Sequence, residues 1–542
     1  MDHNVFKNIA LDYVFDRITV YTPFGETAKK QMQPYRKGDE DKLLEEYDRI
    51  GHIVSLIESQ RYTLLEIRNL FKSIKDLRGS FKRVREETVL STVELFEIKI
   101  FIGLLEKLEE SLKKLKWHIP GDLEITPIPY LKTLFDPQDS GINTFYIYEE
   151  YSEALKAIRE EMKKIEGEIN RGKFEQRTRI EAQTNIKLRP NGEIIINKSN
   201  TALLASVEAC EELTYSSETY MNITYKLKMD ERHEEMHQHM ELLKTQEEEE
   251  EFKIRRYLTG EIHRYIEDID SNIQAIGALD LLVAKGYLAV GMKALKPEII
   301  EEDRIYIEEG RHVKVEDSLR KQEKKFTPIT IGLKKGVTCI TGANMGGKTI
   351  TLKLIGLLTA MAQYGLFVPA AKMAFSLRDT IFFSLGDLQS TDMGLSTFGA
   401  EIMVMKEMLK KSDGRTLILI DELARGTNPS EGYAISKAIV DYLKDKKAMT
   451  VITTHFDGVA DGEGVCHLQV RGLSGVDFEE LQRKLEETAG VLGIELVHQY
   501  MDYRLECIEN RGMVPRDAIN IARLMGLGEE ILKEAERNLE DM

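Results

Sequence analysis

Residues 336–349 read GVTCITGANMGGKT, and the fold expected for the surrounding chain follows from this stretch. Its first part is a short apolar run, which predicts a buried strand. Its second part matches the pattern G-x-x-x-x-G-K-[ST], in which backbone N–H groups close around phosphate oxygens at the start of a helix. In that pattern Lys348 reaches the β- and γ-phosphates, and the Thr349 hydroxyl ligates Mg²⁺. We therefore expect ATP and Mg²⁺ to bind here. The candidate nucleotide-binding residues of the loop are Gly342, Asn344, Gly346, Gly347, Lys348 and Thr349.

Two further apolar runs end in polar residues suited to ATP hydrolysis. Residues 417–420 lead directly into Asp421 and Glu422. In an enzyme with a phosphate loop, the first carboxylate of such a pair holds Mg²⁺, and the second orients and deprotonates the attacking water. Residues 449–453 form the other run, and the polar pair Thr454-His455 that follows it can sense the γ-phosphate. An ordinary strand followed by acidic residues is the alternative for the first run, and a structural histidine is the alternative for the second.

The wider pattern predicts an α/β domain behind a mainly helical region. From about residue 325, short apolar runs alternate with helical segments, which is typical of a largely parallel sheet. Residues 1–180 carry the apolar spacing of helices, interrupted by a proline-containing stretch at 120–137.

A small β-containing module is expected between two long helices. Asn191-Gly192 lies between two β-prone runs, which predicts a hairpin, and a second β-prone stretch covers 220–227. A long acidic helix is expected over about 229–275. From 183 to 228 the chain carries five basic and five acidic residues, and from 230 to 251 it carries ten acidic residues against two basic ones. Such a surface is expected to repel nucleic-acid phosphates.

Composition excludes several classes of protein. The 542 residues allow roughly three to four domains, and 42% hydrophobic residues exclude wholesale disorder. The formal net charge of −17 argues against a protein that coats nucleic acid by charge alone. Four cysteines without a CxxC pair fit a reducing compartment. The apolar stretch 354–371 contains Gln363 and Pro369 and follows the phosphate loop, so a buried helix is favoured over a membrane span, and we expect a cytoplasmic protein.

Several segments resemble the ATPase domain of the MutS family, and in particular the second bacterial MutS paralogue, the branch without a mismatch-reading domain. The motifs that carry the resemblance are TGANMGGKT at 341–349, FVPA at 367–370, LSTF at 395–398, DELARGTNPSEG at 421–432 and TTHF at 453–456. The likeness covers most of the chain and is dense over 310–456 and 502–535. We expect this chain to lack the mismatch-reading and connector domains, and also the small nuclease domain that usually ends the second paralogue.

The resemblance implies further roles. Phe326 would stack on adenine, although a core phenylalanine is the alternative. Gln389 would contact the metal or the attacking water. Ser396 would reach the γ-phosphate of the other subunit's nucleotide, which implies composite sites in a homodimer. The alternative is that Ser396 caps the N-terminus of a helix, and it can have both roles.

The resemblance also suggests a division of the chain into an α/β P-loop ATPase domain preceded by a helical core with a clamp. The expected segments are a helical core and lever domain at 1–180, a small clamp-like β module at 181–230, a returning lever helix and core at 231–310, the ATPase domain at 311–476, and an insertion with a helical dimerisation segment at 477–542.

One motif in the acidic helix invites a metal-binding interpretation. His233-Glu-Glu-Met-His237 matches the zinc-protease pattern H-E-x-x-H, and His239 follows. Because its flanks are acidic and no third ligand follows at a suitable spacing, a solvated helix face is expected instead.

Three functions follow as hypotheses. The first is an ATP-hydrolysing, dimeric MutS-family switch related to DNA mismatch repair or recombination, with DNA as a possible partner. The second is an ATP-driven remodelling partner of another protein, resembling the MutS-like ATPases that help reactivate cobalamin-dependent aminomutases. The third is a scaffold that binds ATP without turnover, and Glu422 argues against it.

Overall fold

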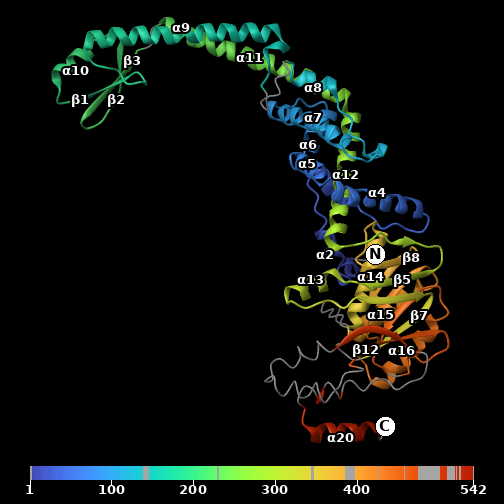
Figure 1. Ribbon diagram of the computed structural model, residues 1–542. Coiled ribbons are helices and arrows are strands. Elements are labelled where there is room, and N and C mark those ends of the chain that lie inside the picture. Colours follow the sequence, from blue (N-terminus) through green and yellow to red (C-terminus); the bar gives the residue numbers. More distant parts are fainter. Residues whose placement is uncertain are drawn as a thin grey trace. The chain divides into compact units, whose positions relative to one another are not determined.

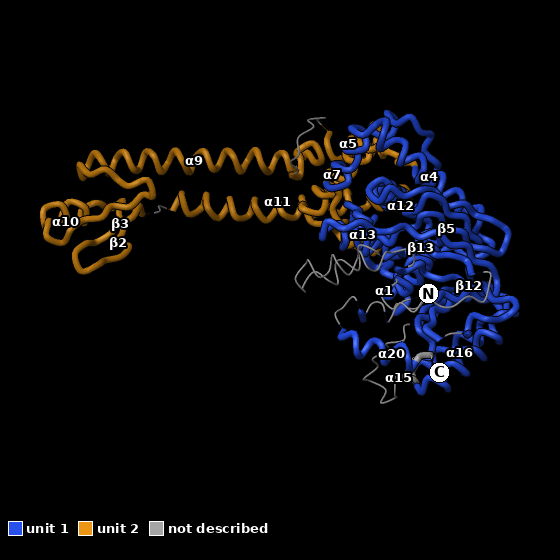
Figure 2. Tube along the Cα trace, turned by 60° about the horizontal axis from the view of Figure 1, so that its bottom comes forward, with its two compact units in different colours: residues 1–72, 111–123, 275–542 blue, residues 73–110, 124–274 orange. Residues whose placement is uncertain are grey.

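Figure 1 shows the computed structural model of the chain. The structure describes residues 3–137, 146–228, 231–342, 347–384, 397–424, 427–456, 458–473, 501–508, 519, 522–523 and 527–540. The chain forms two compact units, each assembled from segments far apart in sequence (Figure 2): unit 1 contains Met1–Lys72, Ser111–Leu123 and Ala275–Met542, and unit 2 contains Ser73–Glu110 and Glu124–Gln274. The expected helical segment 1–180 contributes to both units, and the five-segment division stays a prediction.

A six-stranded sheet forms the centre of unit 1. Its strand order is β13-β12-β7-β11-β10-β9, and every neighbouring pair is parallel except β12 with β13. The largely parallel sheet predicted from the sequence is therefore confirmed. The strands are β7 (Gly336–Thr341), β9 (Thr380–Ser384), β10 (Thr416–Ile420), β11 (Met449–Thr453), β12 (Val465–Gly472) and β13 (Asp502–Cys507).

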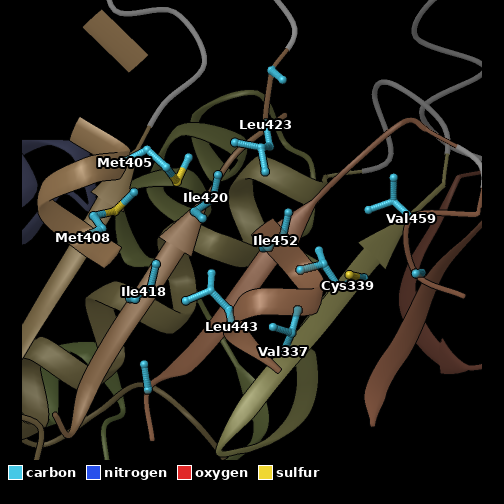
Figure 3. Close-up of a cluster of buried hydrophobic side chains, with 14 residues drawn as sticks. Val337, Cys339, Met405, Met408, Ile418, Ile420, Leu423, Leu443, Ile452 and Val459 are labelled. Carbon is cyan, nitrogen blue, oxygen red and sulfur yellow. The ribbon is translucent and has the colours of Figure 1, made fainter. Parts of the chain in front are cut away.

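Helices cover the central strands on both faces, so these strands are apolar throughout. Every residue of β7, β10 and β11 is buried. Ile418 and Ile420 point into a cluster with Met405 and Met408 of α15 (Thr397–Lys410), and Leu443 of α16 (Pro429–Leu443) joins it (Figure 3). The intervening residue Leu419 points the other way, toward Gly356 of α14 (Lys348–Gln363), whose missing Cβ leaves room for it.

A second sheet in unit 1 was not predicted from the sequence. Its order is β4-β8-β5-β6, with β4 and β8 parallel and the other pairs antiparallel. The strands are β4 (Glu298–Ile299), β5 (Arg304–Gly310), β6 (Ile329–Lys334) and β8 (Lys372–Phe375). The other helices of unit 1 are α1 (His3–Asn8), α2 (Leu11–Asp16), α3 (Pro23–Lys30), α4 (Glu40–Ser59), α5 (Arg61–Lys72), η1 (Gly121–Leu123), α13 (Val313–Lys321) and α20 (Glu529–Glu540).

Two helices belong to both units, α7 (Thr92–Lys113) and α12 (Ile266–Met292). Among the described residues, α12 alone is long and apolar enough to cross a membrane by length and composition. However, 78% of its most apolar window is buried inside the protein, which is the environment of a core helix.

Two long antiparallel helices dominate unit 2 and run side by side (Figure 2). They are α9 (Glu153–Thr184) and α11 (Glu231–Arg264). Ile165 and Ile169 of α9 pack on Leu243 of α11. Nearer the start of α9, Arg159 forms ion pairs with Glu247 and Glu251, each at 2.7 Å. Part of the acidic charge of α11 is therefore neutralised by α9. The remaining helices of unit 2 are α6 (Arg78–Arg85), α8 (Pro129–Phe135), η2 (Glu149–Tyr151) and α10 (Thr201–Glu208).

A three-stranded antiparallel sheet lies where α9 ends and α11 begins. Its order is β1-β3-β2, formed by β1 (Glu193–Asn197), β2 (Leu213–Glu218) and β3 (Asn222–Leu227). The β-prone stretch 220–227 is confirmed as β3, whereas the long helix expected over 229–275 is two helices, α11 and α12.

The predicted hairpin at Asn191-Gly192 is wrong. A turn does form, because Gly192 has φ +79° and its N–H bonds to the Arg189 carbonyl at 2.9 Å. The residues before the turn form no strand, and β1 pairs with β3 instead. Pro190 lacks the N–H that a ladder requires, and Leu188 is buried in the small core of this module.

Candidate functional site

The phosphate-loop motif joins β7 to α14. Gly342 ends the strand with φ +122°, and Gly347 caps the helix with φ +77°, conformations that glycine adopts without steric cost. A Cβ at Gly347 would lie 3.1 Å from the Tyr503 ring, so a side chain there would also meet β13. The N-terminus of α14 therefore starts at the carboxyl edge of the parallel sheet, where helix N–H groups favour anions. Asn344 and Gly346 lie outside the described residues.

Lys348, the first residue of α14, is buried. Its Nζ donates a hydrogen bond to the Gly342 carbonyl at 2.6 Å. Burial lowers the pKa of Lys348, and the nearby carboxylates of Glu422 and Asp421 oppose that shift. The Lys348 ammonium group is thus close enough to the acidic pair after β10 to interact with it electrostatically.

Asp421 accepts hydrogen bonds from two hydroxyl groups. Thr349 Oγ1 donates to Asp421 Oδ2 at 2.7 Å, and Thr453 Oγ1 donates to Asp421 Oδ1 at 2.7 Å. Thr453 ends β11, which lies next to β10 in parallel register. The first turn of α14 and two strand ends therefore meet at one carboxylate. Sequence reasoning missed Thr453, although its position at the end of an apolar run was a usable signal.

These oxygen atoms fit a magnesium ion. A hydroxyl and a carboxylate oxygen 2.7 Å apart are hard ligands of the kind that Mg²⁺ takes with a few waters and phosphate oxygens. Thr349 and Asp421 would hold the ion, as the sequence predicted.

The backbone after Asp421 is strained. Glu422 has φ +50° and Ala424 has φ +58°, in the left-handed region that non-glycine residues rarely adopt. The Glu422 N–H donates to Thr453 Oγ1 at 2.9 Å, which couples this residue to β11. Strain of this kind persists where the surroundings over-determine the backbone, often at functional sites.

Glu401 of α15 helps to hold this strained turn. Its side chain is 4% exposed and accepts a hydrogen bond from the Ala424 N–H at 2.8 Å. Burial raises the pKa of Glu401, against the lowering effect of that hydrogen bond. Sequence reasoning missed this residue. The available signal was a carboxylate in an otherwise apolar part of the expected helix.

Of the other predicted site residues, the structure describes two, His455 and Phe326. His455 is exposed after β11, with its ring 4.3 Å from that of Phe456. The Thr454 N–H bonds to the Ile340 carbonyl at 3.2 Å, so this strand end borders the phosphate loop. Phe326 is half-buried in the segment that leads into β6. Gln389 and Ser396 lie outside the described residues.

The H-E-x-x-H pattern lies on α11, in unit 2. The expected solvated helix face is wrong for His233, which is 9% exposed. A Cβ at Gly172 would lie 2.7 Å from His233 Nε2, so this glycine lets the ring pack on α9. His239 is exposed and lies 3.4 Å from Glu161. In the part of the chain that the structure describes, no group of three or more metal-ligating side chains forms.

Comparisons with known proteins agree with the ATPase motifs. Residues 338–542 match the family model MutS domain V. Endonuclease MutS2 of Halothermothrix orenii is 27% identical over 520 residues, 91% of this chain and 62% of that protein. Endonuclease MutS2 of Acetivibrio thermocellus is 37% identical over 225 residues, 41% of this chain and 28% of that protein.

A MutS protein also matches nearly the whole chain. The DNA mismatch repair protein MutS of Aquifex pyrophilus is 26% identical over 558 residues, 99% of this chain and 60% of that protein. The chain thus spans less than two thirds of the length of these relatives. Together with the family model, the matches confirm the resemblance seen in the sequence: residues 338–542 resemble MutS domain V, and most of the chain is similar to MutS2 and MutS proteins.

Proposed function

We propose that this chain is an ATPase that hydrolyses ATP with Mg²⁺ and acts as a homodimeric switch in DNA repair or recombination. The observation that carries the proposal is the meeting of Thr349, Asp421 and Thr453 through two hydrogen bonds of 2.7 Å beside the phosphate loop. The names of the relatives, an endonuclease MutS2 and a DNA mismatch repair protein, support the biological context. A cytoplasmic location belongs to the same proposal.

Each side chain has a distinct part in the proposed reaction. Lys348 binds the β- and γ-phosphates with the backbone N–H groups of the loop. Bound Mg²⁺ would neutralise charge on the phosphate oxygens. Glu422 takes the proton of the attacking water, and Thr453 fixes the Glu422 backbone. His455 and Gln389 would contact the γ-phosphate region, and Phe326 would stack on adenine.

The proposal extends to the dimer and to unit 2. Ser396 of each chain would complete the partner's nucleotide site. The long helices α9 and α11 would act as a lever, and the small sheet at their ends as a clamp. A protein partner instead of DNA is the second candidate, favoured by the nine acidic side chains between Glu231 and Glu251, only some of which are paired within unit 2.

The experiment compares two substitutions at one position. Thr349→Val removes the hydroxyl and keeps the shape, whereas Thr349→Ser keeps the hydroxyl, which the motif also allows. We expect ATP turnover to fall by about 10²-fold or more in Thr349→Val, the scale of a lost catalytic group, and to need more Mg²⁺. Thr349→Ser should stay near wild type. Equal turnover in the wild type and Thr349→Val would remove this hydroxyl from the site.

A further inference from the structure

A pocket in unit 2 lies far along the chain from the nucleotide loop. Residues of α9, of the turn before β1, of β3 and of α11 line it, and its cavity volume is about 470 Å³. Small-molecule sites typically measure about 300–1,000 Å³. The pocket is therefore large enough for a ligand bigger than a single inorganic ion.

The pocket gathers positive charge that no sequence count reveals. Lys173 of α9 and Lys226 and Lys228 at the end of β3 line it. Within the described part of the chain, these three lysines form no ion pair, and no Asp or Glu lines the pocket. Arg177 also lines it, but Glu181 balances that charge at 3.0 Å. Three unpaired ammonium groups repel one another, and a bound anion would relieve that repulsion.

Two imidazoles complete the wall. His237 and His233 both line the pocket, one helical turn apart on α11. His237 Nε2 is buried and has no hydrogen-bond partner among the described residues, an arrangement that is rare in proteins. An oxygen atom of a ligand in the pocket could accept a hydrogen bond from this nitrogen.

A metal ion fits these surroundings poorly. Two histidines at i and i+4 could share a zinc ion, but three ammonium groups at the same pocket would repel a cation. No third metal ligand joins the pair within the described residues. The surroundings therefore favour an anion.

The pocket also offers an aromatic surface. Phe174 of α9 lines it and is 69% exposed. Exposed aromatic rings beside cations are the arrangement on which nucleobases stack while the cations hold phosphate. The same cavity is thus lined by an aromatic ring and by three lysines that could bind a phosphate group.

We propose that this pocket binds a nucleoside phosphate, either free or as a unit of a nucleic-acid strand, with the phosphate on Lys226, Lys228 and His237 and the base on Phe174. The site is separate from the ATP site in unit 1, so the inference goes beyond the proposed function. Loss of ATP turnover and loss of this binding are distinguishable.

The test uses the full chain saturated with Mg²⁺ and ADP, so that the phosphate loop is occupied. AMP is the probe, and adenosine is its control without phosphate. We expect AMP to bind more tightly than adenosine, and the double variant Lys226→Gln/Lys228→Gln to weaken AMP binding about tenfold or more, as expected for lost charge-assisted hydrogen bonds. The single variant Lys173→Gln, on an exposed helix face, should weaken it in the same direction.

The matched control is Lys198→Gln. Lys198 belongs to the same module but pairs with Glu218 at 3.1 Å and does not line the pocket, so AMP binding should not change. A labelled single strand of 12 nucleotides replaces AMP in the second arm. If the lysine variants bind AMP more weakly, the ligand is a free nucleotide. If they bind only the strand more weakly, the ligand is a unit of a nucleic-acid strand. Equal binding in all variants, no binding of either probe, or tight Zn²⁺ binding that His237→Asn abolishes would overturn the proposal.

Discussion

The side chain of Glu401 lies behind the turn that carries Asp421 and Glu422, where it accepts the Ala424 N–H. We predict that Glu401→Ala lowers ATP turnover by up to about 10²-fold, because a small misplacement of a catalytic group costs that much. Glu401→Gln keeps an acceptor oxygen and should retain most activity. Turnover and KM for ATP are measured for both. If both variants lose turnover equally, the carboxylate has a role beyond positioning the turn.

The raised pKa of Glu401 also predicts how stability depends on pH. A carboxyl whose pKa is raised by folding binds its proton more tightly in the folded chain, so ionising it reduces the free energy of unfolding. That loss is absent below the ordinary pKa of 4.5, grows as pH rises toward the raised pKa, and is constant above it. Glu401→Gln should therefore be more stable than wild type at pH 8 and equal to it at low pH. Thermal unfolding across this pH range measures the difference; a variant less stable at pH 8 contradicts the account.

At the residue scale, the sequence predicted Thr349, Asp421 and Glu422 because their chemistry is tied to short motifs. It missed Glu401, because a carboxylate among apolar helix residues is only a weak signal, and its contact with the turn depends on how the helix packs. The expected solvated face was wrong for His233 for the same reason, since the space for its ring is created by Gly172 on another helix.

At the scale of elements, Arg159 makes a testable contribution to the pairing of α9 and α11. It is partly buried, bonds to Glu247 and Glu251, and also donates to the Ile147 carbonyl. Arg159→Ala should leave two carboxylates close together and destabilise unit 2 by about 1–3 kcal/mol, the scale for hydrogen bonds to charged groups. Arg171→Ala, on the same helix but exposed, is the control. Hydrogen exchange should quicken in α9 and α11 only for Arg159→Ala; equal protection in both variants would contradict this role.

Some strands could be predicted from local sequence patterns and others could not. β7, β10 and β11 are buried on both faces, so they read as continuous apolar runs and were predicted. The short strand β4 has two residues and depends on pairing with β8, which no local pattern reports. The hairpin prediction was wrong because it relied on the turn signal alone. The turn forms, but Pro190 lacks the N–H that a strand before it would need. The charge count over 183–228 could not show that Lys226 and Lys228 line one pocket while none of the acidic residues of that range does, and the expected repulsion of nucleic-acid phosphates stays a prediction.

At the scale of the whole molecule, the composite sites can be tested by mixing chains. If Ser396 acts across the dimer, a mixture of Lys348→Ala and Ser396→Ala chains contains heterodimers with one intact site. ATP turnover should then exceed that of either variant alone, provided that subunit exchange is shown by differential labelling. No recovery after proven exchange would mean that Ser396 acts within its own chain or not at all.

Duplex DNA binding is a second property of the whole molecule. The net charge is −17, and a single basic pocket can neutralise few phosphates. We expect dissociation constants no tighter than the micromolar range near physiological salt, with a shallow dependence on salt concentration. A salt titration with homoduplex, mismatched and branched DNA, with and without ATP, measures this. Nanomolar binding to any of them would rule out the protein-partner candidate and favour a switch that acts on DNA.

The most direct test of the central claim separates ATP binding from ATP hydrolysis. Glu422→Gln removes the proposed base but leaves Lys348 and the loop intact, whereas Lys348→Ala removes a phosphate contact. We predict that Glu422→Gln binds ATP with wild-type affinity and hydrolyses it about 10²-fold or more slowly in a single turnover, and that Lys348→Ala loses affinity as well. Wild-type hydrolysis by Glu422→Gln, or unchanged ATP affinity in Lys348→Ala, would contradict the assignment of the site.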